Sequence, residues 1–277
     1  MDTGIGLPST IRGATRDQLL EWARRSERRG FSSLGTIDRI VYDNYEPLIA
    51  LAAAAAVTER IKLATTILIA PYRINGALLA KQAASLGAIS GGRLVLGLAV
   101  GGREDDYEVS GADFHRRGRA FDAMLEQCSE IWSGDAIGPT GKPSVIVGGS
   151  APATFERVAK YGDGWILGGG TPDMLRDAAE KARAAWSAAG RDGSPRIMAL
   201  AYYALGERAE QAAKGYLGDY YAFLGDYASA IADSAAKDPD TVRAYAHGFS
   251  EAGCDELIFF PCDPDPAQVD LLADTLK

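Results

Sequence analysis

The chain has 277 residues, of which 47% are hydrophobic and 24% are charged, with a formal net charge of -8. The acidic balance argues against a nucleic-acid partner, because proteins that bind a phosphate backbone usually display a basic face. No window approaches the roughly 20 apolar residues of a membrane span, and no signal-peptide pattern begins the chain, so we expect a cytoplasmic protein with no membrane partner. The length is near the roughly 250 residues of a complete (β/α)8 barrel, which predicts one domain over residues 1–277.

Short Val/Ile/Leu-rich runs alternate along the chain with longer Ala-rich amphipathic stretches, as the buried strands and outer helices of a parallel sheet require. We expect eight strands, near Gly4–Leu7, Ser33–Ile37, Ile61–Leu68, Leu94–Val100, Ser144–Val147, Gly164–Leu167, Ile197–Leu205 and Glu256–Pro261. Helical patterns cover 15–29, 46–58, 75–89, 116–133, 151–161, 171–190, 207–235 with 239–252, and 264–276. Eight βα units favour a closed (β/α)8 TIM barrel of the α/β class, with an open doubly wound sheet as the alternative.

The seventh unit carries an unusually long helical segment, 207–252, before the last strand. Its aromatic residues recur at spacings of 3, 4 and 7, which places several of them on one helix face. They are Tyr216, Tyr220, Tyr221, Phe223 and Tyr227. Two interpretations remain open: packing onto the barrel, or an aromatic wall over a pocket.

Functional groups of such barrels follow the carboxyl ends of the strands, so those loops hold the candidate site residues. Strand five leads into Gly148-Gly149-Ser150 and strand six into Gly168-Gly169. Bare glycines before a helix leave backbone N–H groups open to an anion, which makes each turn a candidate phosphate cradle. An ordinary glycine turn is the alternative at both places.

Ionisable residues follow strands two and four. Strand two ends in Asp38-Arg39, for which an internal salt bridge is the alternative to a catalytic pair. Strand four is followed by Gly101 and Arg103 in a charged loop, and Arg117 lies in the basic run that comes next. A merely solvated loop is the alternative for this segment.

Several common sites lack support. The three cysteines are widely spaced and predict free thiols, and neither His115 nor His247 has the spacing of a histidine metal site, so we expect no metal. No GxSxG elbow, Walker A segment or strand-linked GxGxxG occurs in the sequence.

Taken in order, several segments resemble the bacterial luciferase-like monooxygenase superfamily of flavin- and deazaflavin-dependent oxidoreductases. The most specific stretch runs from Leu79-Ala80-Lys81-Gln82-Ala83 through Ser90-Gly91-Gly92-Arg93-Leu94 to Gly101–Tyr107. Arg117-Gly118-Arg119, Val147–Ser150 and Gly162–Ile166 follow in the family's order. The resemblance is strong over residues 3 to about 190 and weak beyond them.

The resemblance implies a cofactor across the barrel mouth, with its ring against strands two to four and its phosphate near strands five and six. Asp38 matches an acidic ring-contact position, and Thr65-Thr66-Ile67 matches a bulged segment behind the ring, where we expect a non-prolyl cis or strained peptide at Thr66-Ile67. Gly148-Gly149-Ser150 matches phosphate-side donors. Arg103 and Arg117 are weaker matches.

Departures from the family pattern limit what the resemblance implies about mechanism. Arg39 stands where many members have histidine, and Gly102 stands where some deazaflavin-dependent dehydrogenases have an acid. The connection from Trp132 to Val145 looks short, which leaves the pocket open or covered by the Tyr-rich segment. Asp38 and Arg39 remain the candidate catalytic residues.

The family implies redox chemistry carried out by the cofactor. We expect a reduced-flavin monooxygenase that uses FMN, supplied by a flavin reductase, on a small and mostly apolar substrate. Coenzyme F420-dependent hydride transfer is the alternative, and a non-catalytic flavin-binding barrel is an alternative of another class. The Ala-rich helix at 50–56 and the family habit also predict a homodimer.

Overall fold

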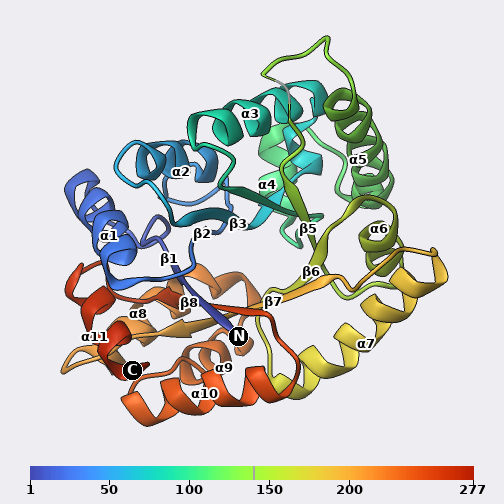
Figure 1. Cartoon of the computed structure of the whole chain (residues 1–277). Coiled ribbons are helices and arrows are strands. Elements are labelled where there is room, and N and C mark those ends of the chain that lie inside the picture. The colour runs from blue at the N-terminus through green and yellow to red at the C-terminus, as the bar shows by residue number, and fades with distance from the viewer. Residues whose placement is uncertain (140) are drawn as a thin grey trace.

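The computed structural model describes residues 1–139 and 141–277. Eight parallel strands pair in chain order and close into a barrel, and helices surround it (Figure 1). Because β1 pairs with both β2 and β8, the sheet has no edge, which confirms the TIM barrel and excludes the open sheet. The strands are β1 (Asp2–Gly6), β2 (Ser33–Thr36), β3 (Lys62–Ile69), β4 (Leu94–Ala99), β5 (Ser144–Gly148), β6 (Gly164–Leu167), β7 (Arg196–Tyr203) and β8 (Glu256–Pro261).

Most helices lie within one to three residues of the expected ranges. They are α1 (Arg16–Arg29), α2 (Pro47–Ala55), α3 (Gly76–Ile89), α4 (Glu104–Ser110), α5 (Arg117–Ser133), α6 (Pro152–Tyr161), α7 (Pro172–Ala188), α8 (Ala209–Tyr220), α9 (Tyr227–Asp233), α10 (Pro239–Glu251) and α11 (Ala267–Thr275), with single 3-10 turns η1 (Pro71–Arg73), η2 (Phe114–Arg116) and η3 (Ala222–Leu224). Helix α1 shows why its ends were predictable. Thr15 and Gln18 form a reciprocal capping box, and Gly30 ends the helix with a φ of 84°.

Two local expectations were wrong. The pattern over 207–235 predicted continuous helix, but the chain breaks into α8, η3 and α9 around Gly225, whose φ of 58° is outside the helical region. The charged loop after β4 contains α4, whose first turn carries Glu104, Asp105 and Asp106. Acidic side chains at a helix N-terminus interact favourably with its dipole, which helps this short helix to form.

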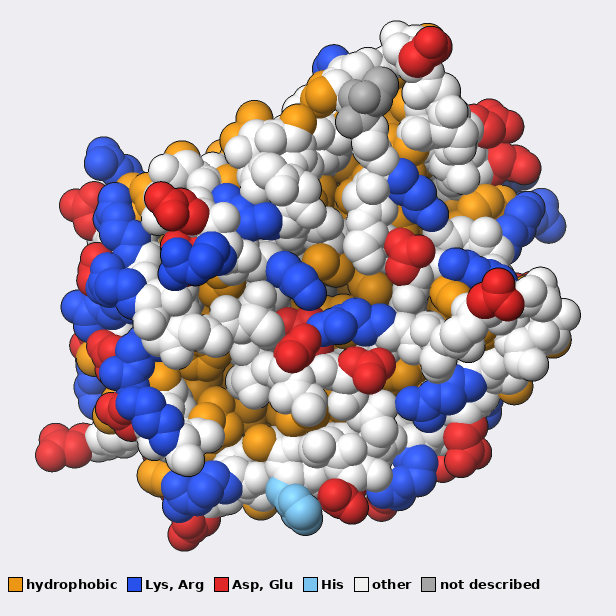
Figure 2. All heavy atoms as spheres, viewed as in Figure 1, with side chains coloured by type: hydrophobic (Ala, Val, Ile, Leu, Met, Phe, Trp, Pro, Cys, Tyr) orange, Lys and Arg blue, Asp and Glu red, His pale blue; other side chains and the backbone are white. Residues whose placement is uncertain are grey.

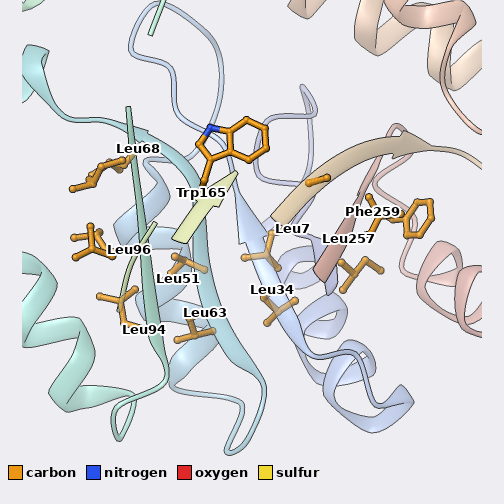
Figure 3. Packing of buried hydrophobic residues seen from close by; sticks show 14 of the residues in the cluster. Leu7, Leu34, Leu51, Leu63, Leu68, Leu94, Leu96, Trp165, Leu257 and Phe259 are labelled. Atoms are coloured by element: carbon orange, nitrogen blue, oxygen red, sulfur yellow. The ribbon is translucent and has the colours of Figure 1, made fainter. Parts of the chain in front are cut away.

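Strand side chains alternate between two hydrophobic layers. Leu63, Leu257 and Phe259 face the layer between strands and helices, where Leu51 of α2 also packs (Figure 3). Ile258 and Phe260 point into the barrel, where they join side chains from α8. The barrel interior and the α8 segment therefore form one packed unit, which places α8 over the mouth.

Glycines in β1 and β2 make room for Phe260 inside the barrel. A Cβ on Gly6 would lie 2.3 Å from Phe260 Cδ1, and one on Gly35 would lie 2.8 Å from its Cζ. The ring is 1% exposed and cannot swing away. Close approach, rather than an unusual φ, explains glycine at these two positions.

The outer surface mixes charges of both signs. Figure 2 shows basic and acidic side chains interspersed over one face, with hydrophobic groups between them. Cys128, Cys254 and Cys262 are buried and free, as the sequence predicted. Among the described residues, no helix is long and apolar enough to cross a membrane.

Candidate functional site

A cavity opens at the carboxyl ends of the barrel strands, the position at which this architecture places its functional groups. We call it the reaction cavity. It is lined by Ile37, Asp38, Arg39, Thr66, Ile67, Ile69, Tyr72, Gly101, Gly102, Arg103, Asp106, Tyr107, Gly168, Leu200, Tyr202, Tyr220, Tyr221 and Phe223.

Asp38 lies just after β2, and its side chain is buried against the segment that follows β3. Its Oδ2 accepts hydrogen bonds from the backbone N of Ile69 at 2.9 Å and from Arg73 Nη2 at 3.0 Å. Burial raises the pKa of Asp38 above its usual value, and the nearby Arg73 opposes that shift only in part. Asp38 is therefore a carboxyl group held rigidly at the cavity wall, as the sequence indicated.

Tyr72, on the 3-10 turn after β3, was missed by the sequence analysis. Its ring is 3% exposed, and its Oη is buried without a hydrogen bond to any described residue. Burial and the charge of Asp38 both raise the pKa of Tyr72 far above its ordinary range, so the hydroxyl stays protonated. The site thus contains a neutral hydroxyl close to the Asp38 carboxyl group.

Arg39 is tied to α4 rather than free in the cavity. Its Nε lies 3.0 Å from Asp106 Oδ2, and its Nη2 donates to Val41 O at 2.7 Å. Its guanidinium also lies over the rings of Tyr42 and Tyr220. Arg39 therefore forms an internal salt bridge, which was one of the two alternatives from the sequence, and its partner is Asp106. A catalytic role for Arg39 stays a prediction.

The Thr65-Thr66-Ile67 segment is irregular. The Thr66–Ile67 peptide is cis, which confirms that prediction, and the register of β3 against β4 shifts between Thr65 and Leu68. Thr66 and Ile67 line the reaction cavity, whereas Thr65 lies outside its lining and donates to Gly97 O at 2.7 Å.

Aromatic side chains from β7 and from the segment after α8 form another wall of the reaction cavity. The hydroxyls of Tyr202 and Tyr221 lie 2.7 Å apart, and Phe223 packs under the guanidinium of Arg103 at 4.1 Å. Tyr216 is buried among the barrel side chains, whereas Tyr227 is 65% exposed. Both interpretations of the Tyr-rich segment therefore hold, because the segment packs onto the barrel and also walls the cavity.

The predicted glycine and arginine positions divide into two groups. Gly101, Arg103 and Gly168 line the reaction cavity. The others lie outside its lining: Gly148, Gly149, Ser150, Gly169 and Arg117. Gly148 is near, since a Cβ there would lie 3.1 Å from Ile67 Cγ2, and the Arg117 guanidinium stacks on Phe114 at 3.8 Å.

Three lining residues had only weak signals in the sequence. Tyr202 is the second-last residue of β7. Its side chain points into the barrel mouth, but the strand register is needed to predict this. Tyr72 follows β3 directly, and Asp106 lies within the charged segment after β4. The predicted strand ends identified the loops that line the cavity. Which side chain of a loop enters the cavity depends on the backbone conformation of that loop.

The family model for luciferase-like monooxygenases matches residues 1–253. The chain belongs to this family. An uncharacterised protein of Mycobacterium tuberculosis is 32% identical over 191 residues, a match that covers 55% of this chain and 66% of the relative. The F420-dependent hydroxymycolic acid dehydrogenase of the same organism is 28% identical, with 75% of this chain and 61% of the relative covered. The matches thus span less than two thirds of these curated relatives.

Solved structures of two oxidoreductases share the fold. The monooxygenase RslO1 from Streptomyces bottropensis has a TM-score of 0.83 and 23% identity, with 100% of this chain and 98% of that one covered. An F420-dependent secondary alcohol dehydrogenase, solved with an F420-acetone adduct, has the same TM-score at 18% identity and covers both chains fully. At such identities the likeness establishes the architecture alone.

Proposed function

We propose that this luciferase-like oxidoreductase is a reduced-flavin-dependent monooxygenase that acts on a small, mostly apolar substrate. The proposal rests on the pairing of charges in the reaction cavity. Arg39 is bonded to Asp106, Arg103 to Asp105, and Asp38 to Arg73. Apart from Thr66 and three glycines, the remaining wall is aliphatic or aromatic with neutral tyrosine hydroxyls, so the cavity favours chemistry that needs water excluded and few free charges.

The lining residues fit a flavin-type ring. A planar ring system needs a flat apolar wall and a few polar contacts. Ile67 and the Tyr202–Tyr221 pair offer the apolar wall, and the Asp38 carboxyl group offers a polar contact. The phosphate would extend toward β5 and β6, whose turns have exposed glycines.

A reduced flavin, when bound, supplies the electrons that activate dioxygen. The chain's own contribution is to bind and orient the substrate, to keep water out and to hold protons. Tyr202 and Tyr221 present hydroxyls that burial keeps protonated, because it raises the pKa of both. These groups can donate hydrogen bonds to a substrate oxygen. We further propose that a separate flavin reductase supplies the reduced FMN.

Coenzyme F420-dependent hydride transfer is the second candidate. Two relatives favour it, the mycobacterial dehydrogenase named above and the F420-dependent glucose-6-phosphate dehydrogenase of Nocardia farcinica, which is 24% identical with 61% of this chain and 58% of the relative covered. In that reaction Asp38, rather than the aromatic wall, would have the larger catalytic role.

A binding comparison tests both candidates. Purified protein is titrated with FMN and F420, each oxidised and reduced, and we expect reduced FMN to bind best. Preferential binding of F420, followed by its reduction by an alcohol, would replace the monooxygenase with the dehydrogenase. Tight binding without turnover of any donor would indicate a non-catalytic flavin-binding barrel.

A matched pair of variants locates the ring. Tyr221→Ala removes part of the aromatic wall, and we expect it to weaken the affinity for reduced FMN by about tenfold, which is about 1.4 kcal/mol. Tyr227→Ala removes an exposed ring of the same segment and should leave the affinity unchanged. Equal affinities in the two variants would place the ring away from this wall.

A further inference from the structure

A second cavity, lined mostly by polar and charged residues, lies beside the reaction cavity, and we call it the side cavity. It is lined by Asp38, Arg39, Ile40, Asn44, Glu46, Tyr72 and Arg73. Asp38, Arg39 and Tyr72 line both cavities and therefore form the partition between them. On the other side lies Glu46, whose side chain is 36% exposed.

Polar atoms without partners gather around the side cavity. Tyr72 Oη, Asn44 Oδ1 and Arg73 Nε are all buried without a hydrogen bond to any described residue. Buried polar groups in folded proteins are nearly always satisfied by protein or by ordered water. The side cavity measures about 370 Å³, whereas one water needs roughly 10–15 Å³, so several waters fit within it.

Arg73 connects the two ends of the side cavity. Its Nη2 lies 3.0 Å from Asp38 Oδ2 and 2.9 Å from Glu46 Oε1. The guanidinium holds a buried carboxyl group at the reaction cavity and a second, partly exposed one near solvent. Glu46 is itself anchored, because its Oε2 accepts from the backbone N of Ile49 at 2.8 Å.

We infer that Asp38 and Tyr72 pass protons between the reaction cavity and solvent through water in the side cavity, with Glu46 at the outer end. The inference rests on the proposed function only in requiring a reaction that takes up or releases a proton. Both candidate reactions do so: oxidation of an alcohol by hydride transfer releases a proton, and oxidation of reduced flavin by dioxygen takes one up.

The proton transfer conserves atoms and charge, and no residue is oxidised or reduced. At each step one O–H bond breaks on the donor and one O–H bond forms on the acceptor. Tyr72 donates its proton into the reaction cavity and accepts another from Asp38 or a neighbouring water in the same event. The exchange is concerted, because burial beside Asp38 raises the pKa of Tyr72 and disfavours a free phenolate. Arg73 acts as a positioning residue for the two carboxyl groups.

Tyr72→Phe tests the route, because it removes the hydroxyl and keeps the ring. Protein loaded with reduced FMN is mixed with dioxygen in H2O and in D2O, and flavin oxidation is followed by absorbance and proton uptake by a pH indicator. We expect the rate to fall by about tenfold or more in the variant and the H2O/D2O rate ratio to rise. The affinity for FMN should stay within about threefold of wild type.

Two further variants separate the route from general damage. Glu46→Gln keeps an acceptor for the Ile49 N–H but removes the ionisable group, and should also slow oxidation and raise the isotope effect. Ser9→Ala removes another buried hydroxyl that has no partner among the described residues but lines neither cavity, so it should behave as wild type.

Wild-type rate and isotope effect in Tyr72→Phe would overturn the inference. A loss of FMN affinity with an unchanged isotope effect would also overturn it, because the hydroxyl would then be a ligand-binding donor.

A high-resolution crystal structure provides a test that needs no cofactor. We expect ordered water within hydrogen-bond distance of Tyr72 Oη and Asn44 Oδ1, and a dry side cavity would refute the route. If neither cofactor binds, the proposed function fails, and the crystal structure still decides the water route.

Discussion

The carboxylate of Asp106 on α4 holds the segment that follows β2 through Arg39. Nε of Arg39 lies 3.0 Å from Oδ2 of Asp106, and the two side chains are 6% and 3% exposed. The other oxygen of Asp106 accepts from the backbone N of Ile40 at 3.0 Å and of Val41 at 2.7 Å. One buried carboxylate therefore fixes both a cation and a loop backbone beside the reaction cavity.

Removal of that carboxylate should be strongly destabilising. Asp106→Ala would leave the Arg39 charge buried without its partner, and we expect the free energy of unfolding to fall by about 3–5 kcal/mol. The control is Asp173→Ala, whose ion pair with Arg176 is exposed and should cost under about 1 kcal/mol. Denaturant titration measures the free energy of unfolding of both variants. Equal losses would show that the buried Arg39–Asp106 pair contributes no more to stability than an exposed ion pair.

The barrel interior should not tolerate a methyl group at Gly6. Gly6→Ala would overpack the fixed ring of Phe260, so we expect a loss of about 1–3 kcal/mol in the free energy of unfolding. Gly87→Ala in α3 meets no atom within 4 Å and should stabilise the helix by roughly 0.5–1 kcal/mol. Opposite shifts of the two melting temperatures are the expected outcome.

The phosphate position can be decided by a carboxylate at either glycine turn. Gly149 is an unsuitable site, because its φ of 129° strains any side chain and a Cβ would lie 2.8 Å from Thr154 Oγ1. Ser150→Asp and Gly168→Asp avoid that conflict. We expect Ser150→Asp to lower cofactor affinity at least about tenfold by repelling the phosphate. A loss confined to Gly168→Asp would move the phosphate to the β6 turn.

Alkaline pH should destabilise the fold through its buried tyrosines. Burial raises the pKa of Tyr202, Tyr216 and Tyr220 well above the usual value of about 10, and raises that of Tyr42 to about 12. The folded state therefore keeps protons that the unfolded chain releases. Their stabilising contribution is complete below pH 10 and is lost as the pH rises further. Unfolding measured between pH 7 and 11.5 should show this decline, and a flat profile would contradict it.

We expect the predicted homodimer to form through α2 and α3, which pack side by side (Figure 1). Near the starts of these helices, Ile49 of α2 and Leu78 of α3 are 69% and 54% exposed, and Ile74, just before α3, is 62% exposed. We expect a dimer by light scattering, and a shift toward monomer in Ile49→Glu and Leu78→Glu. A monomeric wild-type protein at micromolar concentration would refute the prediction.

The helix pattern was predictable where one local signal acts alone. Thr15 and Gly30 bound α1 because capping is decided by a few neighbouring residues. The break at Gly225 was missed for the opposite reason, since the aromatic pattern on either side continues with helical spacing. Asp38 was predicted as a site residue because it is ionisable, follows a strand end and matches a family position. Tyr72 also follows a strand end, but no motif singles it out.

The number and order of the βα units and the loops that carry the site were predictable from the sequence, because periodicity and helix caps are local signals. The cis peptide at Thr66–Ile67 was expected from the family resemblance. Which side chains meet is known only once the chain is folded. Closing the barrel brings Asp38, Tyr72 and Asp106 from three different loops together with the Tyr-rich segment from beyond β7. Such contacts depend on the register and backbone of each loop, and no single segment of the chain encodes them.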